Sequence, residues 1–119
     1  MTIIRESDLI DSIAEALQYI SYFHPADFIR AMSAAWEREE NPAAKEALAQ
    51  ILVNSRMCAI GHRPICPDTG TANISIKVGA DARLELSGSL QNAMDEATRR
   101  AYKLDTNPLR ASVVVDPTG

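Results

Sequence analysis

The feature that most limits the fold of this 119-residue chain is one change in its hydrophobic period. Over the first sixty residues, apolar side chains recur at steps of three and four, which is the spacing of amphipathic helices. From residue 73 they alternate instead, with Ile74, Ile76 and Val78 on one side of an extended segment. The sequence therefore predicts an α+β fold, predominantly helical at first, with strands appearing in the second half.

Two prolines and a glycine divide the helical region, which we expect to cover residues 7–61. The pattern breaks before Pro25 and again before Pro42, and proline suits the first turn of a helix because its missing N–H would have no partner there. Ser7 is the expected cap of the first helix. Gly61 is the expected end of the third helix, since glycine readily adopts the left-handed conformation of a helix stop.

The second half predicts three further elements within the same domain, 1–119. Alternating residues on both sides of a turn indicate a β-hairpin over 73–86. Ser87 or Ser89 can cap a helix over 88–104. A run of β-branched residues then indicates a terminal strand over 110–115. Because turn-forming residues follow that strand at once, we expect the chain to be a piece of a longer protein.

Composition narrows the class of protein. The chain is 46% hydrophobic and 24% charged, which is ordinary for a globular domain. Its formal net charge is −4 and its basic residues are scattered, so nucleic acid is not an expected partner. No stretch reaches the roughly 18–20 apolar residues that span a bilayer, and the N-terminus has no secretion signal. We therefore expect a cytoplasmic protein.

Reactive side chains are concentrated in one loop, which we place at residues 62–72. It combines the thiol of Cys66 with the carboxylate of Asp68 and is stiffened by Pro64 and Pro67. A rigid loop on a helical scaffold is a reasonable place for a functional site. The same residues also make an ordinary turn in which the aspartate bonds its own backbone. Both interpretations are open from the residues alone.

The loop sequence Cys66-Pro67-Asp68-Thr69-Gly70 resembles the Cys-x-Asp-Thr-Gly signature of class I fumarases and related iron–sulfur hydro-lyases. Other runs resemble the same family in the same order along most of the chain. These are Asn54-Ser55-Arg56, Ile76-Lys77-Val78-Gly79, Leu109-Arg110-Ala111-Ser112 and Asp116-Pro117. The chain is thus similar to the N-terminal portion of a fumarate hydratase or of an alpha-type tartrate dehydratase.

The resemblance implies a cofactor and roles for four residues. It makes Cys66 one of three thiolates that hold a 4Fe–4S cluster, whose remaining iron acts as a Lewis acid in the reversible hydration of fumarate to malate. It places Asp68 beside the substrate in the acid–base apparatus, and it makes Arg110 the partner of a substrate carboxylate. Pro67 stands at the substrate where the family usually has Gln, so a hydrogen-bond donor is missing there.

The resemblance also implies what this chain lacks. A three-thiolate cluster needs two further cysteines, and the sequence has only Cys58 besides Cys66. We therefore expect an inactive N-terminal fragment whose partners are a small dicarboxylate or related hydroxy-diacid and the remainder of the enzyme, which is expected to be a homodimer. The alternatives are a non-catalytic helical interaction module and the small subunit of a two-chain dehydratase such as tartrate dehydratase.

Five other residues have simpler expected roles. Cys58 lies on the apolar face of its helix, so a buried core thiol is expected. Trp36 is expected in the core as well. His62 is expected to be a surface histidine at a helix end, and His24 a local cap or another surface residue. Ser55 interrupts the apolar pattern close to the loop and is expected, at most, to brace it.

Overall fold

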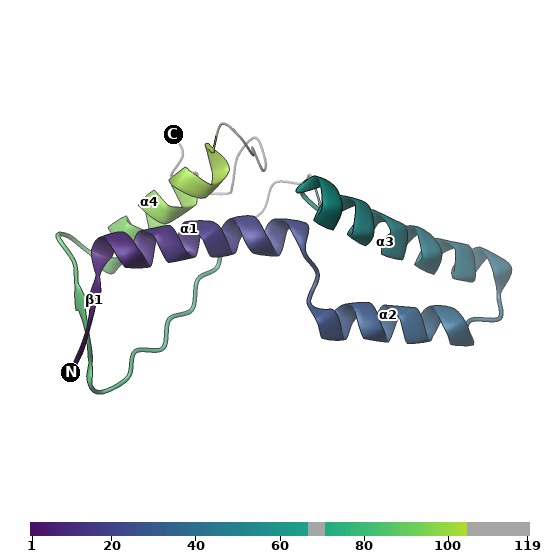
Figure 1. The fold of residues 1–119 in the computed structure, drawn as a ribbon, viewed down its shortest axis with the longest axis horizontal. Helices are drawn as coiled ribbons and strands as arrows, with labels where there is room; N and C mark the ends of the chain where they lie inside the picture. Colours follow the sequence, from purple (N-terminus) through teal and green to yellow (C-terminus); the bar gives the residue numbers. More distant parts are fainter. Residues whose placement is uncertain (67–70, 105–119) are drawn as a thin grey trace. The chain divides into compact units, whose positions relative to one another are not determined.

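A computed structural model describes residues 1–66 and 71–104 and confirms the α+β class (Figure 1). The chain divides into two compact units, one formed by Ile20–Cys66 and one that joins Met1–Tyr19 to residues after 66. The strand predicted over 110–115 lies outside the described residues. The elements, in order, are β1 (Thr2–Arg5), α1 (Glu6–Tyr22), α2 (Ala26–Arg38), α3 (Pro42–Gly61), β2 (Ala82–Glu85) and α4 (Leu90–Tyr102).

Short polar side chains start two of the helices, and the cap at Ser89 is one that the sequence predicts. Asn41 precedes α3, and its Oδ1 accepts the N–H groups of Ala43 at 3.0 Å and Ala44 at 3.3 Å. Ser89 caps α4 by accepting the N–H of Asn92 at 3.1 Å. Such caps satisfy N–H groups that have no partner inside the helix. Ser7 does not cap α1, because that helix already begins one residue earlier.

The predicted hairpin over 73–86 is wrong. Within that range only Ala82–Glu85 forms a strand, and it pairs in parallel with β1 at the N-terminus, with Thr2 opposite Ala82 and Arg5 opposite Glu85. The expected turn is present, since the Ala82 N–H donates to the Gly79 carbonyl at 3.0 Å. What the local pattern does not reveal is the partner, because the alternation of a strand specifies its faces and not its neighbour.

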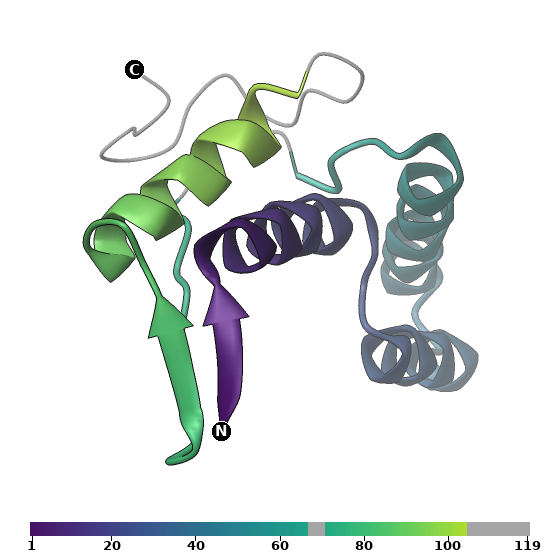
Figure 2. The same cartoon turned by 60° about the vertical axis from the view of Figure 1, so that its left-hand side comes forward.

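Parallel pairing explains how the first unit builds its core. β1 runs directly into α1, and β2 leads to α4 through residues 86–89, so both helices follow the same end of the sheet, as the two arrows of Figure 2 show. The start of α1 can therefore pack beside the start of α4. Ile10 of α1 joins a cluster of buried α4 side chains, with Ile13 and Leu86 packed against it. The α4 members of the cluster are Ala93, Met94 and Ala97.

Charged residues cover the outer face of α4 and tie it to α1. Glu96 accepts hydrogen bonds of 2.7 Å from both Arg99 and Arg100. These bonds, with Arg99 as the larger cause and Arg100 as the second, lower the pKa of the Glu96 carboxyl to about 2. Arg100 also donates to Asp11 of α1 at 3.0 Å. These exposed pairs add little stability individually, but the last one links two helices that are far apart in sequence.

The second unit contains α2 and α3, which lie side by side (Figure 1). Its interior is thin. No residue of α2 is buried, and Trp36, expected in the core, is 39% exposed, with the Lys45 ammonium 4.6 Å from its ring centroid. The buried residues of α3 are Ser55 and Cys58. None of the described helices has the length and apolar character of a membrane-crossing helix.

The core cluster of the first unit generates a test of stability. We expect Ile10→Ala to lower the free energy of unfolding by about 2–4 kcal/mol, because it removes buried methyl groups and leaves a cavity. The control is Ile20→Ala on the same helix, where the side chain is 65% exposed and the expected change is within about 0.5 kcal/mol. Urea unfolding followed by circular dichroism measures both. Equal losses in the two variants would contradict this description of the core.

Candidate functional site

The loop singled out by the sequence begins inside the described residues and continues beyond them. Of the four residues to which the resemblance gives roles, Cys66 is described, while Pro67, Asp68 and Arg110 lie outside the described residues. The site can therefore be built from the segment 62–66 and from the elements that hold it. The residues of α1 and α3 that contact the segment belong, like the segment itself, to the second unit, Ile20–Cys66.

The segment starts where α3 ends in a left-handed turn. His62, and not the expected Gly61, adopts that conformation, with φ 48° and ψ 53°. Histidine is among the few non-glycine residues that are enriched in this region of backbone space. The Arg63 N–H then donates back to the Cys58 carbonyl at 3.1 Å, a bond of the type that closes many helix C-termini. The turn redirects the chain sharply away from the helix axis.

Two aromatic rings hold the His62 side chain. The imidazole stacks on Tyr22, the last residue of α1, with centroids 5.3 Å apart and planes 6° apart. Phe23 meets the same imidazole edge-on at 5.9 Å. Tyr22 is 4% exposed, and burial raises the pKa of its hydroxyl. His62 is an exposed histidine at a helix end, as expected, but its stacking was not foreseen. The run of aromatic residues before Pro25 was the available signal.

Backbone and thiol groups complete the attachment of the segment. The Ile65 N–H donates to the Ser21 carbonyl at 2.8 Å. Cys58 is buried, as expected, and its Sγ lies 3.6 Å from both the Pro64 carbonyl oxygen and Asn54 Oδ1. A thiol carries one weakly donated proton, so these two acceptors share it. Three successive residues before Cys66 are thus in contact with α1 or α3.

A part-buried polar pair contacts the same half of α3. His24 Nδ1 lies 2.9 Å from the hydroxyl of Ser55, and the imidazole stacks on Phe28 at 4.4 Å. His24 is half-buried, so the expectation of a local cap or surface residue is wrong. The contact is with the connection between α1 and α2, so the expectation that Ser55 braces the loop stays a prediction. The pair joins the connection between α1 and α2 to α3, which sequence patterns within one helix cannot indicate.

The nucleophilic group that the described part of the segment exposes is the thiol of Cys66. Among them, no group of three His, Cys, Asp or Glu side chains is arranged to hold a metal ion. A thiolate is nevertheless a good ligand for iron–sulfur clusters. One exposed thiol on a braced segment can supply a single ligand to a cluster whose other ligands come from elsewhere. Cys58 is unsuited to that role, since its sulfur is already buried and bonded.

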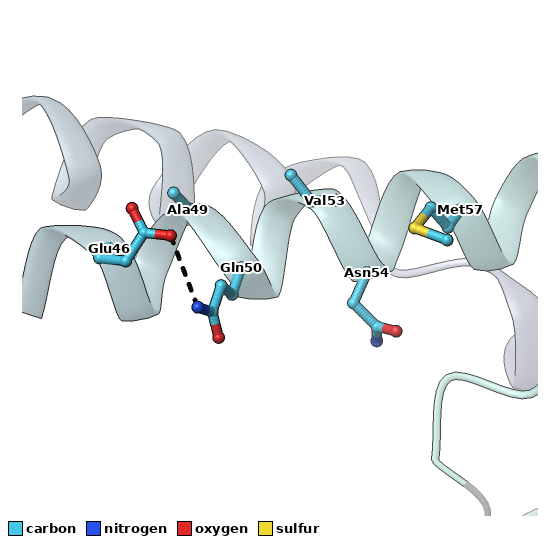
Figure 3. A pocket seen from close by; sticks show the side chains of 6 residues that line it. All are labelled: Glu46, Ala49, Gln50, Val53, Asn54 and Met57. Atoms are coloured by element: carbon cyan, nitrogen blue, oxygen red, sulfur yellow. Dashed lines mark hydrogen bonds between the residues drawn. The ribbon is translucent and has the colours of Figure 1, made fainter.

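A shallow hollow of about 400 Å³ runs along α3, and no residue of the segment 62–66 belongs to its lining (Figure 3). One of its ends holds a 3.5 Å hydrogen bond from Gln50 to Glu46. Glu46 is the one ionisable residue of its lining, so the hollow lacks the paired acid–base groups that an elimination reaction needs. Its lining residues are Glu46, Ala49, Gln50, Val53, Asn54 and Met57.

The different environments of the two cysteines generate a test. We expect Cys66 to react with a thiol reagent at least about tenfold faster than Cys58, because labelling a buried thiol requires local opening of the structure. Peptide mass spectrometry after short exposures measures the two rates, and denatured protein, in which both thiols are accessible, is the control. Faster labelling of Cys58 would contradict the described site.

Comparison with known proteins agrees with the loop motif. The family model described as "Fumarate hydratase (Fumerase)" matches residues 10–119. One curated relative, from Methanocaldococcus jannaschii, is named "Putative L(+)-tartrate dehydratase subunit alpha". It is 24% identical over 104 residues, which cover 87% of this chain and 36% of the relative. The chain therefore spans about a third of the length of the curated relative that it matches.

The family match includes the whole Cys66 loop and all but the first nine residues of the chain. It also includes the four runs on which the resemblance rested. The resemblance is thereby confirmed: this chain belongs to the fumarate hydratase (Fumerase) family.

Proposed function

We propose that this chain is part of an iron–sulfur hydro-lyase, to which it contributes one cluster ligand and part of the substrate site. The observation that carries the proposal is the exposed Cys66 thiol, held on a braced segment directly before the Pro67-Asp68-Thr69-Gly70 motif of the family. The reaction is the reversible hydration of fumarate to malate. By itself the chain is inactive, since two cluster thiolates must come from outside it.

The donor available in this chain fits a 4Fe–4S cluster. Cys66 is exposed and free, so deprotonation lets its sulfur bind iron without breaking an existing contact. When bound, a cluster with three thiolates supplies at its remaining iron a Lewis acid for the substrate hydroxyl and a carboxylate. The contribution of this chain is to present the thiolate from a fixed backbone, which spares the cluster from ordering the segment as it binds.

The residues that follow the described segment have proposed roles at the substrate. Arg110 binds a substrate carboxylate, since guanidinium presents two parallel N–H donors to the two oxygens. Asp68 belongs to the acid–base network beside the substrate. Dehydration of malate breaks the C2–O bond and removes a proton from C3, and the base that takes this proton lies outside the chain. Pro67 contributes no donor, in contrast to the Gln that is usual at this position.

A second substrate is supported by the curated relative, which is named as a tartrate dehydratase alpha subunit. Tartrate differs from malate by one more hydroxyl and undergoes the same type of elimination. In this version of the proposal, the chain belongs to one subunit of a two-chain dehydratase. Comparing fumarate hydration with tartrate dehydration by the complete, anaerobically reconstituted enzyme distinguishes the two substrates. Activity toward neither substrate would contradict the proposed function.

The ligand role of Cys66 is tested by substitution in the complete enzyme. We expect Cys66→Ser to abolish the visible absorption of the cluster after anaerobic reconstitution, because a serine hydroxyl is a poor ligand at a thiolate position. Cys58→Ser is the matched control and should retain the absorption, since that sulfur is buried and bonded within the chain. A cluster that survives in Cys66→Ser would contradict the assignment.

The role of Arg110 has a separate test with a different readout. We expect Arg110→Ala to lower kcat/KM roughly a hundredfold, because a carboxylate loses its charged two-point partner. Cluster absorption should be unchanged. Arg110→Lys keeps the charge without the parallel N–H pair, so an intermediate loss is expected. Unchanged kinetics in Arg110→Ala would remove this residue from the substrate site.

A further inference from the structure

The segment that precedes Cys66 is attached to the end of α1 at two points, three residues apart. The first point is the stack of His62 on Tyr22, with centroids separated by 5.3 Å. The second is the 2.8 Å hydrogen bond from the Ile65 N–H to the carbonyl of Ser21. Residues 62–65 thus lie along residues 21–22 at both of their ends. Cys66 is the next residue after the second point, so little backbone freedom remains between the attachment and the sulfur.

The conformation of His62 makes the stack more than a surface contact. A non-glycine residue at φ 48° is unfavourable unless its surroundings hold it, and such residues cluster at functional sites. Here the surroundings are Tyr22, parallel to the imidazole, and Phe23, which meets it edge-on at 5.9 Å. Tyr22 is itself buried at 4% exposure, so the ring that supports His62 is fixed. The two aromatic rings therefore stabilise the left-handed turn through the side chain of the residue that makes it.

We propose that His62, stacked on Tyr22, is a positioning residue that holds the Cys66 thiolate ready for the iron–sulfur cluster. The inference rests on the proposed function. A ligand held in place before binding does not lose conformational entropy when the cluster arrives, so the complex is tighter and dissociates more slowly. His62 acts through the backbone of residues 63–65 and touches neither cluster nor substrate.

Variants on both sides of the stack separate the ring contact from other effects. His62→Asn keeps a residue that tolerates the left-handed conformation and removes the ring. Tyr22→Leu removes the supporting ring from the other side, while Tyr22→Phe keeps it and is the conservative control. His62 and Tyr22 act through one contact. The double variant His62→Asn with Tyr22→Leu should therefore have no larger effect than the more severe of the two single variants.

The first measurement is made on this chain and does not depend on a cluster. Loss of an aromatic stack corresponds to a change of about three- to tenfold in a local equilibrium. We therefore expect hydrogen exchange at the Ile65 amide to become about three- to tenfold faster in His62→Asn and Tyr22→Leu, and to stay within about twofold in Tyr22→Phe. The Leu52 amide in the middle of α3 follows global unfolding, so its rate measures how much each variant lowers overall stability. Unchanged Ile65 exchange in both ring-removing variants, or acceleration in Tyr22→Phe as large as in Tyr22→Leu, overturns the proposal.

The second measurement uses the complete enzyme and follows loss of cluster absorption in the presence of an iron chelator. We expect His62→Asn and Tyr22→Leu to lose the cluster about three- to tenfold faster, and Tyr22→Phe to match the unsubstituted enzyme. Cys66→Ser separates the two proposals. If Cys66→Ser retains the cluster, the proposed function fails. If Cys66→Ser loses the cluster but both ring-removing variants release it at the normal rate, the positioning role alone fails. The positioning role also fails if Tyr22→Phe releases the cluster as fast as Tyr22→Leu.

Discussion

The parallel ladder between β1 and β2 is the constraint on which the first unit depends. It joins Thr2–Arg5 to Ala82–Glu85, so nearly eighty residues must leave the sheet and return to it in the same direction. Parallel strands require a crossover connection, and this crossover contains α1, α2, α3 and the Cys66 segment. Each strand continues into a helix, and the buried cluster of Ile10 with Ala93, Met94 and Ala97 forms between those helices. The functional segment therefore belongs to a connection whose ends are fixed by backbone hydrogen bonds and by a small apolar core.

Within the second unit, two cysteines eight positions apart have opposite environments. Cys58 faces the interior, where its proton is shared between Asn54 and the Pro64 carbonyl, and it helps to hold the segment. Cys66 follows that segment and is exposed. The difference arises from the left-handed turn at His62, which takes the chain off the α3 axis between the two sulfurs. Thus one thiol supports the backbone, and the other is left available to a ligand.

Local signals in the sequence predicted local structure well. The predicted helix start at Ser89 depends on a bond to an N–H group three residues away, and the structure shows this bond. Contacts between distant segments were not predictable in this way. Strand β1 is only four residues long and merges into α1, so no alternation marks it. The hairpin was expected because 73–78 and 83–87 both alternate, yet β2 pairs with β1. In the site, Cys66 was recognised by its family motif, while the supports at Tyr22, Ser21 and His24 are contacts across more than thirty residues.

In the proposed function, Pro67 has a consequence for how substrate is recognised. A site that hydrogen-bonds a substrate hydroxyl discriminates strongly against molecules that lack it, because its own polar groups are then left unpaired. Proline has neither a side-chain donor nor a backbone N–H. The position next to Cys66 therefore has no donor that would be left unpaired by a substrate without a hydroxyl. Arg110 recognises a carboxylate, a group that fumarate, malate and tartrate share. Of the residues assigned to substrate, only Asp68 can then respond to a hydroxyl, and as a carboxylate it accepts hydrogen bonds without donating them. This combination favours recognition of one carboxylate of a diacid by this chain, with the other end and the chemistry at the centre left to the cluster and to the residues beyond this chain.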